Sequence, residues 1–199
     1  AAVAILADAG LPFVGGPTLN VYNSRTLEVL AKAGMQRWVL PFELSRTTAA
    51  DLIAAAPAQC PCEVFAWGRL PLAWSARCYT ARAEDLPKDH CDLACLADPD
   101  GRLMRTREDA PFLVLNGIQT QSALTQDLLP WMDELRAAGV AVLRLSPQSE
   151  QMAEVVAHFD AARRKSPAPA ELEALERLAP VGTCDGYWRG EAGFTREAT

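Results

Sequence analysis

Three cysteines lie in one polar segment of the sequence, "SARCYTARAEDLPKDHCDLAC" at residues 75–95. Twelve residues separate Cys78 from Cys91, and three residues separate Cys91 from Cys95. Cysteine thiolates bind zinc and iron–sulfur clusters, for which four ligands are usual. Because the segment is polar, the ordinary alternative of buried core cysteines is the weaker interpretation. The spacing therefore predicts a metal site without identifying the metal.

The expected geometry of this site follows from the spacing of its cysteines. Cys91 and Cys95 are four residues apart, so on a helix both sulfurs would project from one face. Cys78 would approach from the end of the preceding strand, with the intervening residues closing a loop over the site. His90 could add a nitrogen ligand, although a lone histidine in a loop is more often solvated.

The whole chain contains six cysteines among 199 residues. That number is small for a secreted disulfide framework and large for a cytosolic enzyme with no use for thiols. Cys60 and Cys62 flank a proline at the start of an apolar run, where a structural role is favoured over ligation, and Cys184 is assigned no role. This usage favours the reducing cytoplasm and a metal or redox site.

The composition excludes several classes of protein. A net charge of −6 and a pI near 5.0 argue against nucleic-acid binding, which requires a basic surface. No run of eighteen apolar residues is present, so no transmembrane segment is expected. The first residues, "AAVAILADAGLPFVGG", contain Asp8 and lack a preceding basic region, so they do not resemble a signal peptide.

Apolar runs alternate with amphipathic stretches along most of the chain, as in βα units. The apolar runs predict strands at 17–23, 37–41, 62–68, 111–117 and 140–147. The amphipathic stretches predict helices at 24–34, 47–56, 123–139 and 149–165. Asp100-Gly101 predicts the turn of a hairpin over 96–106. A short helix is expected within the Pro/Ala-rich stretch 166–180.

This alternation predicts an α/β fold with parallel strands and right-handed crossovers. A doubly wound sheet and a (β/α) barrel both satisfy it, and no G-x-G-x-x-G or G-x-x-x-x-G-K-[ST] motif supports a nucleotide-binding version. About five strands are too few for an eight-fold barrel of roughly 250 residues. We therefore expect the C-terminal part of an incomplete or truncated barrel at 1–165, followed at 166–199 by a linker and a Gly-rich tail packing on it.

The segment "CEVFAWGRLPLAWSARC" resembles the collagenase-like (U32) peptidase family. The residues that match the family pattern are Glu63, Phe65, Gly68, Ser75, Arg77 and Cys78. Three positions depart from it: Trp67 replaces a histidine, Pro71 stands where peptidase-like members often carry another cysteine, and Ala76 replaces a glycine. The absence of this histidine weakens the interpretation that the protein is a peptidase.

Those departures, with "LNGIQTQSA" (115–123) and "CDGYWRGEAG" (184–193), are most similar to the UbiV branch of that family, over about residues 17–193. The resemblance implies a (β/α) barrel-like fold and a 4Fe–4S cluster on four cysteines. Three of these match Cys78, Cys91 and Cys95. The fourth would lie in an N-terminal part of the barrel that precedes this sequence.

The same resemblance implies a role in ubiquinone biosynthesis. The implied reaction is the oxygen-independent hydroxylation of the aromatic ring of ubiquinone precursors. The implied partners are a UbiU-like protein, which forms a heterodimer with this chain, and a UbiT-like lipid-binding protein as accessory. A small ubiquinone precursor would be the substrate. Two alternatives from other classes stay open: a U32 peptidase, and a zinc-stabilised binding module without catalytic activity.

Catalytic residues are not identified by the sequence, but three candidates follow predicted strands or the cysteine motif. In a barrel, chemistry is placed at the C-terminal ends of strands. Glu43, Arg77 and Asn116 occupy such places and could bind an anionic substrate or donate hydrogen bonds to cluster sulfurs. Alternatively, Glu43 and Arg77 form a loop salt bridge and Asn116 makes a turn. The only histidines are His90 and His158, which leaves little material for a hydrolytic triad.

Overall fold

The computed structural model describes residues 2–87 and 90–196. The helices are α1 (Ala2–Asp8), α2 (Ser24–Lys32), α3 (Arg46–Ala55), α4 (Tyr79–Ala83), α5 (Met132–Ala137), α6 (Met152–Ala162), α7 (Pro169–Glu176) and α8 (Gly186–Arg189). The strands are β1 (Phe13–Gly15), β2 (Met35–Val39), β3 (Cys62–Trp74), β4 (Arg102–Arg105), β5 (Pro111–Asn116), β6 (Gln119–Asp127), β7 (Val142–Leu145) and β8 (Thr183–Cys184). Three 3-10 helices are η1 (Pro17–Leu19), η2 (Ala94–Ala97) and η3 (Leu129–Trp131).

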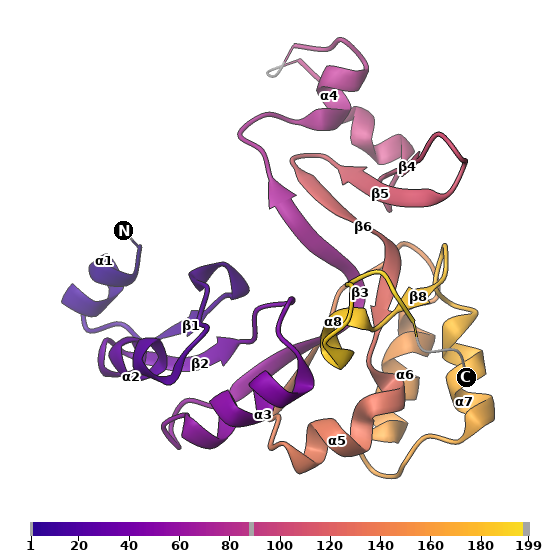
Figure 1. The fold of residues 1–199 in the computed structure, drawn as a ribbon. Coiled ribbons are helices and arrows are strands. Elements are labelled where there is room, and N and C mark those ends of the chain that lie inside the picture. Colours follow the sequence, from indigo (N-terminus) through magenta and orange to yellow (C-terminus); the bar gives the residue numbers. More distant parts are fainter. Residues whose placement is uncertain (1, 88–89, 197–199) are drawn as a thin grey trace.

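A parallel sheet in the order β1–β2–β3–β7 forms the body of the molecule (Figure 1). Trp38 on β2 is in register with Cys62 on β3, and Phe65 on β3 with Arg144 on β7. Helices α2 and α3 connect the first three strands, and α5 precedes β7. The expected βα alternation therefore builds this part of the fold.

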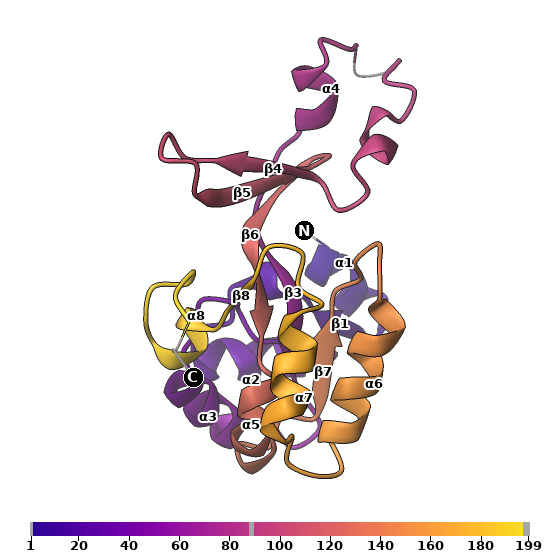
Figure 2. The same ribbon diagram turned by 90° about the vertical axis from the view of Figure 1, so that its right-hand side faces the viewer.

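One face of the parallel sheet packs against helices. The main core combines strand residues with residues of α2, α3, α5, α6 and α7 (Figure 2). Its strand members are Phe13, Met35, Trp38, Cys62, Val64, Ala66, Trp67, Leu143 and Leu145. Successive side chains of a strand point to opposite faces, so the intervening residues Arg37, Glu63 and Arg144 lie on the other face. That face carries charge, whereas the helix-covered face is apolar.

The long strand β3 leaves the parallel sheet at Gly68. From Trp67 onward β3 pairs with antiparallel β6. Strands β5 and β4 follow in antiparallel order, and β8 is parallel to β6. Gly68 has φ +127°, and a Cβ there would lie 2.4 Å from the Cβ of Ser146. Glycine is therefore required for the close approach of β3 to the residue that follows β7.

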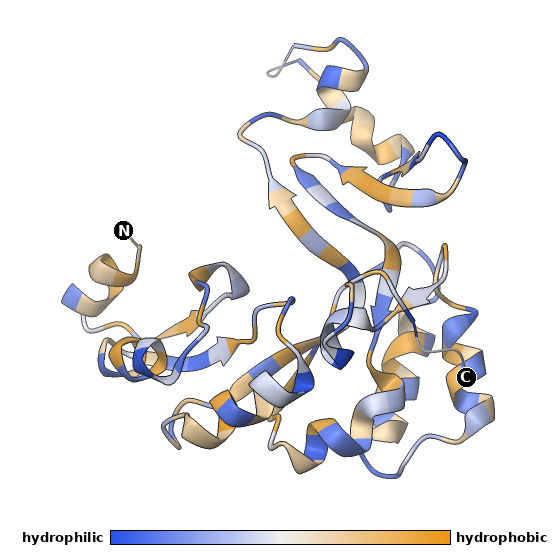
Figure 3. Ribbon diagram, in the orientation of Figure 1, coloured by the Kyte–Doolittle hydropathy of each residue, from blue (hydrophilic) through white to orange (hydrophobic). Residues whose placement is uncertain are grey.

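The excursion after β3 forms a separate projection, which we call the cysteine lobe: α4, η2, β4 and β5, residues 79–116. It stands away from the helix-covered part of the sheet (Figures 1 and 2). Within it α4 contacts both η2 and β5, and β4 pairs with β5. Figure 3 shows that β5 is largely hydrophobic while the turn between β4 and β5 is hydrophilic.

The α/β class is confirmed, because the described residues form one open sheet of eight strands with eight helices. The (β/α) barrel stays a prediction. Helices α2, α3, α5 and α6 on one face of a parallel sheet are the arrangement of a barrel wall, and the sheet is open at β1 and β7. The predicted strand at 111–117 forms as β5, but it is antiparallel and not part of a βα unit.

The predicted strand at 17–23 is wrong. Residues 17–19 form η1, Asn20 is left-handed with φ 54°, and the strand lies earlier, at β1. Val21 is buried in the core despite having no strand partner. The predicted helix after it is confirmed as α2, but Asn23 rather than Ser24 caps it, accepting a hydrogen bond from the Thr26 amide.

The predicted helix at 123–139 is wrong in its first half, because residues 119–127 form β6 and α5 begins only at Met132. Strand β6 is hydrogen bonded to β3 on one side and β5 on the other. These pairings are distant in sequence, so the amphipathic pattern of the segment could not reveal them. Pro130 lies in the first turn of η3, between strand and helix.

The hairpin predicted over 96–106 is also wrong in its strands. Asp100-Gly101 does form a turn, in which the Gly101 amide donates to the Asp98 carbonyl. However, η2 precedes that turn, and β4 pairs instead with β5 across residues 106–110. The remaining predictions are confirmed: the helices at 47–56 and 149–165, and the strands at 37–41, 62–68 and 140–147. Their predicted and observed ends differ by at most three residues, except that β3 continues to Trp74.

The segment after residue 165 contains the expected short helix, α7, which contacts α6. Leu175 of α7 and Trp188 of α8 are both buried in the main core. Tyr187 packs on a second small cluster around Phe65. No helix in residues 2–87 and 90–196 is long and apolar enough to cross a membrane.

Candidate functional site

All three cysteines of the predicted metal site belong to the cysteine lobe or its entry. Cys78 caps the N-terminus of α4, and its sulfur accepts a hydrogen bond from the Ala81 amide at 3.4 Å. Cys95 lies in η2, and Cys91 precedes that helix. Each of the three is half-buried with a free thiol. Because α4 contacts η2, the three cysteines lie on neighbouring elements of one small lobe.

The expectation that Cys91 and Cys95 share a helix face is wrong. Asp92 and Leu93 between them are left-handed, with φ 45° and 55°, and η2 starts only at Ala94. A left-handed conformation is costly for a bulky residue such as leucine. The two cysteines are therefore separated by a backbone reversal and not by one helical turn.

Arg102 connects the two elements that carry the cysteines. Its Nε donates to Oδ2 of Asp98 at 2.6 Å, and its Nη1 pairs with Glu84. Glu84 follows α4 and Asp98 follows η2. Arg102 thus joins the ends of both helical turns from its position on β4.

We expect Arg102→Met to loosen the cysteine lobe without unfolding the body. Exposed ion pairs are individually weak, so amide exchange at residues 79–87 and 91–98 should accelerate only several-fold, as measured by deuterium uptake. Arg105→Met is the matched control, because Arg105 lies on the same strand but pairs with Asp109. Equal acceleration in both variants would contradict the role given to Arg102.

The donor chemistry of the lobe fits a thiolate-bound metal, but the sulfurs are not gathered around one point. In the part of the chain that the structure describes, no three cysteine, histidine, aspartate or glutamate side chains form a group that could hold a metal ion. Holding a cluster would require Cys78, Cys91 and Cys95 to approach one another. His90, the alternative ligand, is exposed.

The other three cysteines have a different environment. Cys60, Cys62 and Cys184 are at most 1% exposed. Burial, assisted by the nearby carboxylate of Glu63, raises the pKa of Cys62 to about 12, and burial together with the charge of Asp185 raises the pKa of Cys184 to about 12. Burial also raises the pKa of Cys60. These thiols stay protonated at neutral pH and are poor ligands and nucleophiles.

Glu43 and Arg77 do not come together. Glu43 lies beyond the end of β2, where it is exposed and accepts a hydrogen bond from the Tyr22 hydroxyl. That hydrogen bond raises the pKa of Tyr22. Arg77 is exposed beside Cys78, and among the described residues its side chain forms no ion pair with Glu43. The loop salt bridge considered for these two residues is therefore not formed.

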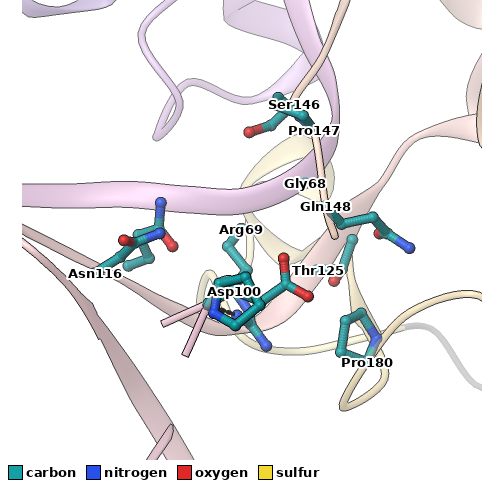
Figure 4. A pocket seen from close by; sticks show the side chains of 11 residues that line it. Gly68, Arg69, Asp100, Asn116, Thr125, Ser146, Pro147, Gln148 and Pro180 are labelled. Atoms are coloured by element: carbon teal, nitrogen blue, oxygen red, sulfur yellow. Dashed lines mark hydrogen bonds between the residues drawn. The ribbon is translucent and has the colours of Figure 1, made fainter. Parts of the chain in front are cut away.

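Asn116 ends β5 and lines a cavity of about 60 Å³ (Figure 4). Gly68 and Arg69 of β3 line the same cavity, as do Asp100 and Ser146. The cavity lies beyond the C-terminal end of β7 and at the exit of β3 from the parallel sheet. The sequence indicated Asn116 but missed Arg69, which lies just beyond the predicted strand at 62–68 and became part of β3.

Trp67 occupies the place where the family pattern has a histidine. It is fully buried, and its Nε1 donates to Oε1 of Gln148 at 3.1 Å. Its ring lies edge-on to Phe159 with centroids 6.4 Å apart. The tryptophan thus fills core space beside the cavity, and it offers no imidazole for proton transfer.

Glu63, which matches the family's glutamate, is also placed by the structure. It is 3% exposed and pairs with Arg37 at 2.9 Å and with Arg144. These arginines come from β2 and β7, on either side of β3. The three residues connect three parallel strands on the face opposite the main core, and pairing compensates the buried carboxylate.

Comparison with known proteins gives one family. Residues 2–196 match the family model described as Peptidase family U32. No solved structure matches the chain.

Proposed function

The chain belongs to peptidase family U32, and from that premise we propose that it is a 4Fe–4S protein of oxygen-independent ubiquinone biosynthesis. It would act as a subunit of a UbiU–UbiV type hydroxylase of the aromatic ring. Cys78, Cys91 and Cys95 are the proposed ligands. A fourth cysteine would come from a part of the protein outside this sequence.

The observation that supports this proposal is the division of the six cysteines into two sets. The three motif cysteines are half-buried, lie on neighbouring elements and have free thiols. The other three are buried, and their raised pKa values keep them protonated. Thiolates are the form that binds iron, so only the cysteine lobe and its entry at Cys78 offer accessible sulfur ligands within the described residues.

The backbone of the lobe also supports a change of shape on ligation. Asp85, Asp92 and Leu93 all have positive φ values, and such residues are strained relative to right-handed backbone. Strain of this kind is typical of segments that change conformation or bind ligands. Drawing the three sulfurs together would move these same residues.

An iron–sulfur cluster supplies one-electron transfer when it is bound. Hydrogen bonds to sulfur tune its reduction potential, and the Ala81 amide already donates to the Cys78 sulfur. A hydroxylation without oxygen requires redox equivalents and another oxygen donor. The proposed partners are a UbiU-like protein in a heterodimer and a UbiT-like lipid-binding protein, with a small ubiquinone precursor as substrate.

The proposal is tested by anaerobic purification with all four cysteines present, followed by iron and sulfide quantification. We expect a brown protein with about four irons and four labile sulfides per chain. Zinc at about one per chain with no visible absorbance would instead support the zinc-stabilised binding module. Peptide cleavage that survives chelators would favour the peptidase. A colourless, iron-free preparation would contradict the proposal.

A further inference from the structure

A polar cavity lies where β3 and β7 end, outside the cysteine motif. Gly68 and Arg69 enter it from β3, and Ser146 enters it from the end of β7 (Figure 4). Asp100 and Asn116 close it from the cysteine lobe. The cavity is thus built at the junction between the parallel sheet and the lobe, the place where α/β folds bind ligands.

Among the described residues that line this cavity, Arg69 is the only positively charged one. Its Nη1 donates to the backbone carbonyl of Asp100, whereas its Nε is buried without a hydrogen-bond partner among the described residues. Burial lowers the pKa of the guanidinium, although the negative charge of Asp100 opposes this shift. A buried cation with an unused donor is costly unless an anion compensates it.

No carboxylate of the described residues provides that compensation directly. None of their ion pairs, defined by separations up to 4.0 Å, includes Arg69. The carboxylate of Asp100 is bound elsewhere: Oδ1 accepts from the Ser149 amide at 2.8 Å and Oδ2 from the Ser149 hydroxyl at 2.5 Å. Arg69 therefore lines the cavity with a charge that no ion pair of the described residues compensates and with an Nε that donates no hydrogen bond there.

We infer that this cavity binds the oxyanion group of a small molecule, a carboxylate or a phosphate, through Arg69. The planar guanidinium matches both groups. The amide of Asn116 and the hydroxyls of Ser146 and Thr125 line the same space and add neutral donors. The volume of about 60 Å³ exceeds the roughly 10–15 Å³ that one water requires, so the cavity can hold a small oxyanion group.

The cavity is physically connected to the cysteine lobe. Asn116 is followed by Gly117, whose carbonyl accepts from the Tyr79 amide at 2.7 Å, next to Cys78. On the other side, the Asp98 amide donates to the Cys95 carbonyl at 3.1 Å, two residues before Asp100. An oxyanion bound to Arg69 would therefore lie beside Asn116 and Asp100, whose chain neighbours are hydrogen bonded to the turns that carry Cys78 and Cys95. Its binding does not depend on the cluster and extends the function proposed above.

The test measures thermal stability and calorimetric binding of the protein with malonate or inorganic phosphate, against sodium chloride at equal ionic strength. We expect at least one of the two probes to bind wild type, and the preferred probe identifies the group. Arg69→Gln should weaken that binding roughly tenfold or more, as expected for a lost charged hydrogen bond. In the absence of probe, Arg69→Gln should be at least as stable as wild type, because a poorly compensated buried charge is removed.

Two further variants keep the inference falsifiable. Arg25→Gln removes an arginine whose side chain is 87% exposed, and it should bind the probe as wild type does. Asp100→Asn removes the negative charge beside the cavity and should tighten binding several-fold. The inference is overturned if neither probe binds wild type, if Arg69→Gln binds equally well, or if Asp100→Asn binds no more tightly.

Discussion

Replacing Cys78, Cys91 or Cys95 singly with alanine should remove most of the iron from protein purified anaerobically. Each substitution deletes one thiolate of the proposed set. Loss of even an outer-shell partner costs roughly 10–100-fold in metal affinity, so the loss of a ligand should cost at least tenfold. Iron and sulfide content and the visible absorbance of each variant provide the measurement.

The matched controls are Cys60→Ala and Cys184→Ala. Both thiols are fully buried, and their raised pKa values keep them protonated. Removing them should leave the iron content per folded chain unchanged, while creating small cavities that lower thermal stability. If the control variants lose iron as completely as the motif variants do, the cysteine lobe is not the cluster site.

Asp127→Asn should change how stability depends on pH. The Asp127 side chain lies at the end of β6 and is 1% exposed. Burial raises its pKa from 3.8 to about 6, although the Leu129 amide and the charge of Arg196 oppose this shift. The negative charges of Glu176 and Asp185 also face it and raise the pKa further.

The direction in which stability changes with pH depends on whether the folded or the unfolded state binds more protons. Between about pH 4 and pH 6 the unfolded chain releases the Asp127 proton while the folded protein retains it, so stability falls as pH rises. At 1.36 kcal/mol for each pH unit, the raised pKa corresponds to a loss of about 3 kcal/mol above pH 6. An asparagine cannot ionise, so the free energy of unfolding of the variant should not decrease in this way.

Urea unfolding of wild type and Asp127→Asn across this pH range gives the measurement. The difference in free energy of unfolding should move in favour of the variant by about 3 kcal/mol as pH rises from about 4 to 7.5. Asp109→Asn, at a carboxylate whose side chain is 86% exposed, should give a curve parallel to wild type. If wild type instead becomes more stable relative to Asp127→Asn as pH rises, Arg196 keeps Asp127 ionised in the folded protein, and our expectation is wrong.

Several features of this protein follow from local sequence. The amphipathic stretches became α2, α3 and α6, and the apolar runs became β2, β3 and β7, because periodicity and caps act over a few residues. The U32 family was also identified from one segment, 62–78, which now forms β3 and the entry to the cysteine lobe. These features required no knowledge of distant contacts.

Other features depended on pairing between distant residues. Residues 123–127 have a helical pattern but form part of β6, since β3 and β5 flank them with hydrogen bonds. Cys91 and Cys95 have helical spacing but are separated by left-handed residues. For residues 123–127, pairing with distant strands outweighs a local preference of about 1 kcal/mol.

The sequence by itself determined the α/β class and the family, and it indicated Cys78, Cys91 and Cys95 as the candidate metal ligands. Only the tertiary structure decided that Cys60, Cys62 and Cys184 are protonated core residues and that Arg69 lies in a polar cavity with no ion-pair partner among the described residues. The physical reason is that burial sets both the charge of a thiol and the need of an arginine for an anion. Burial is a property of the packed chain, and no local pattern of residues contains it.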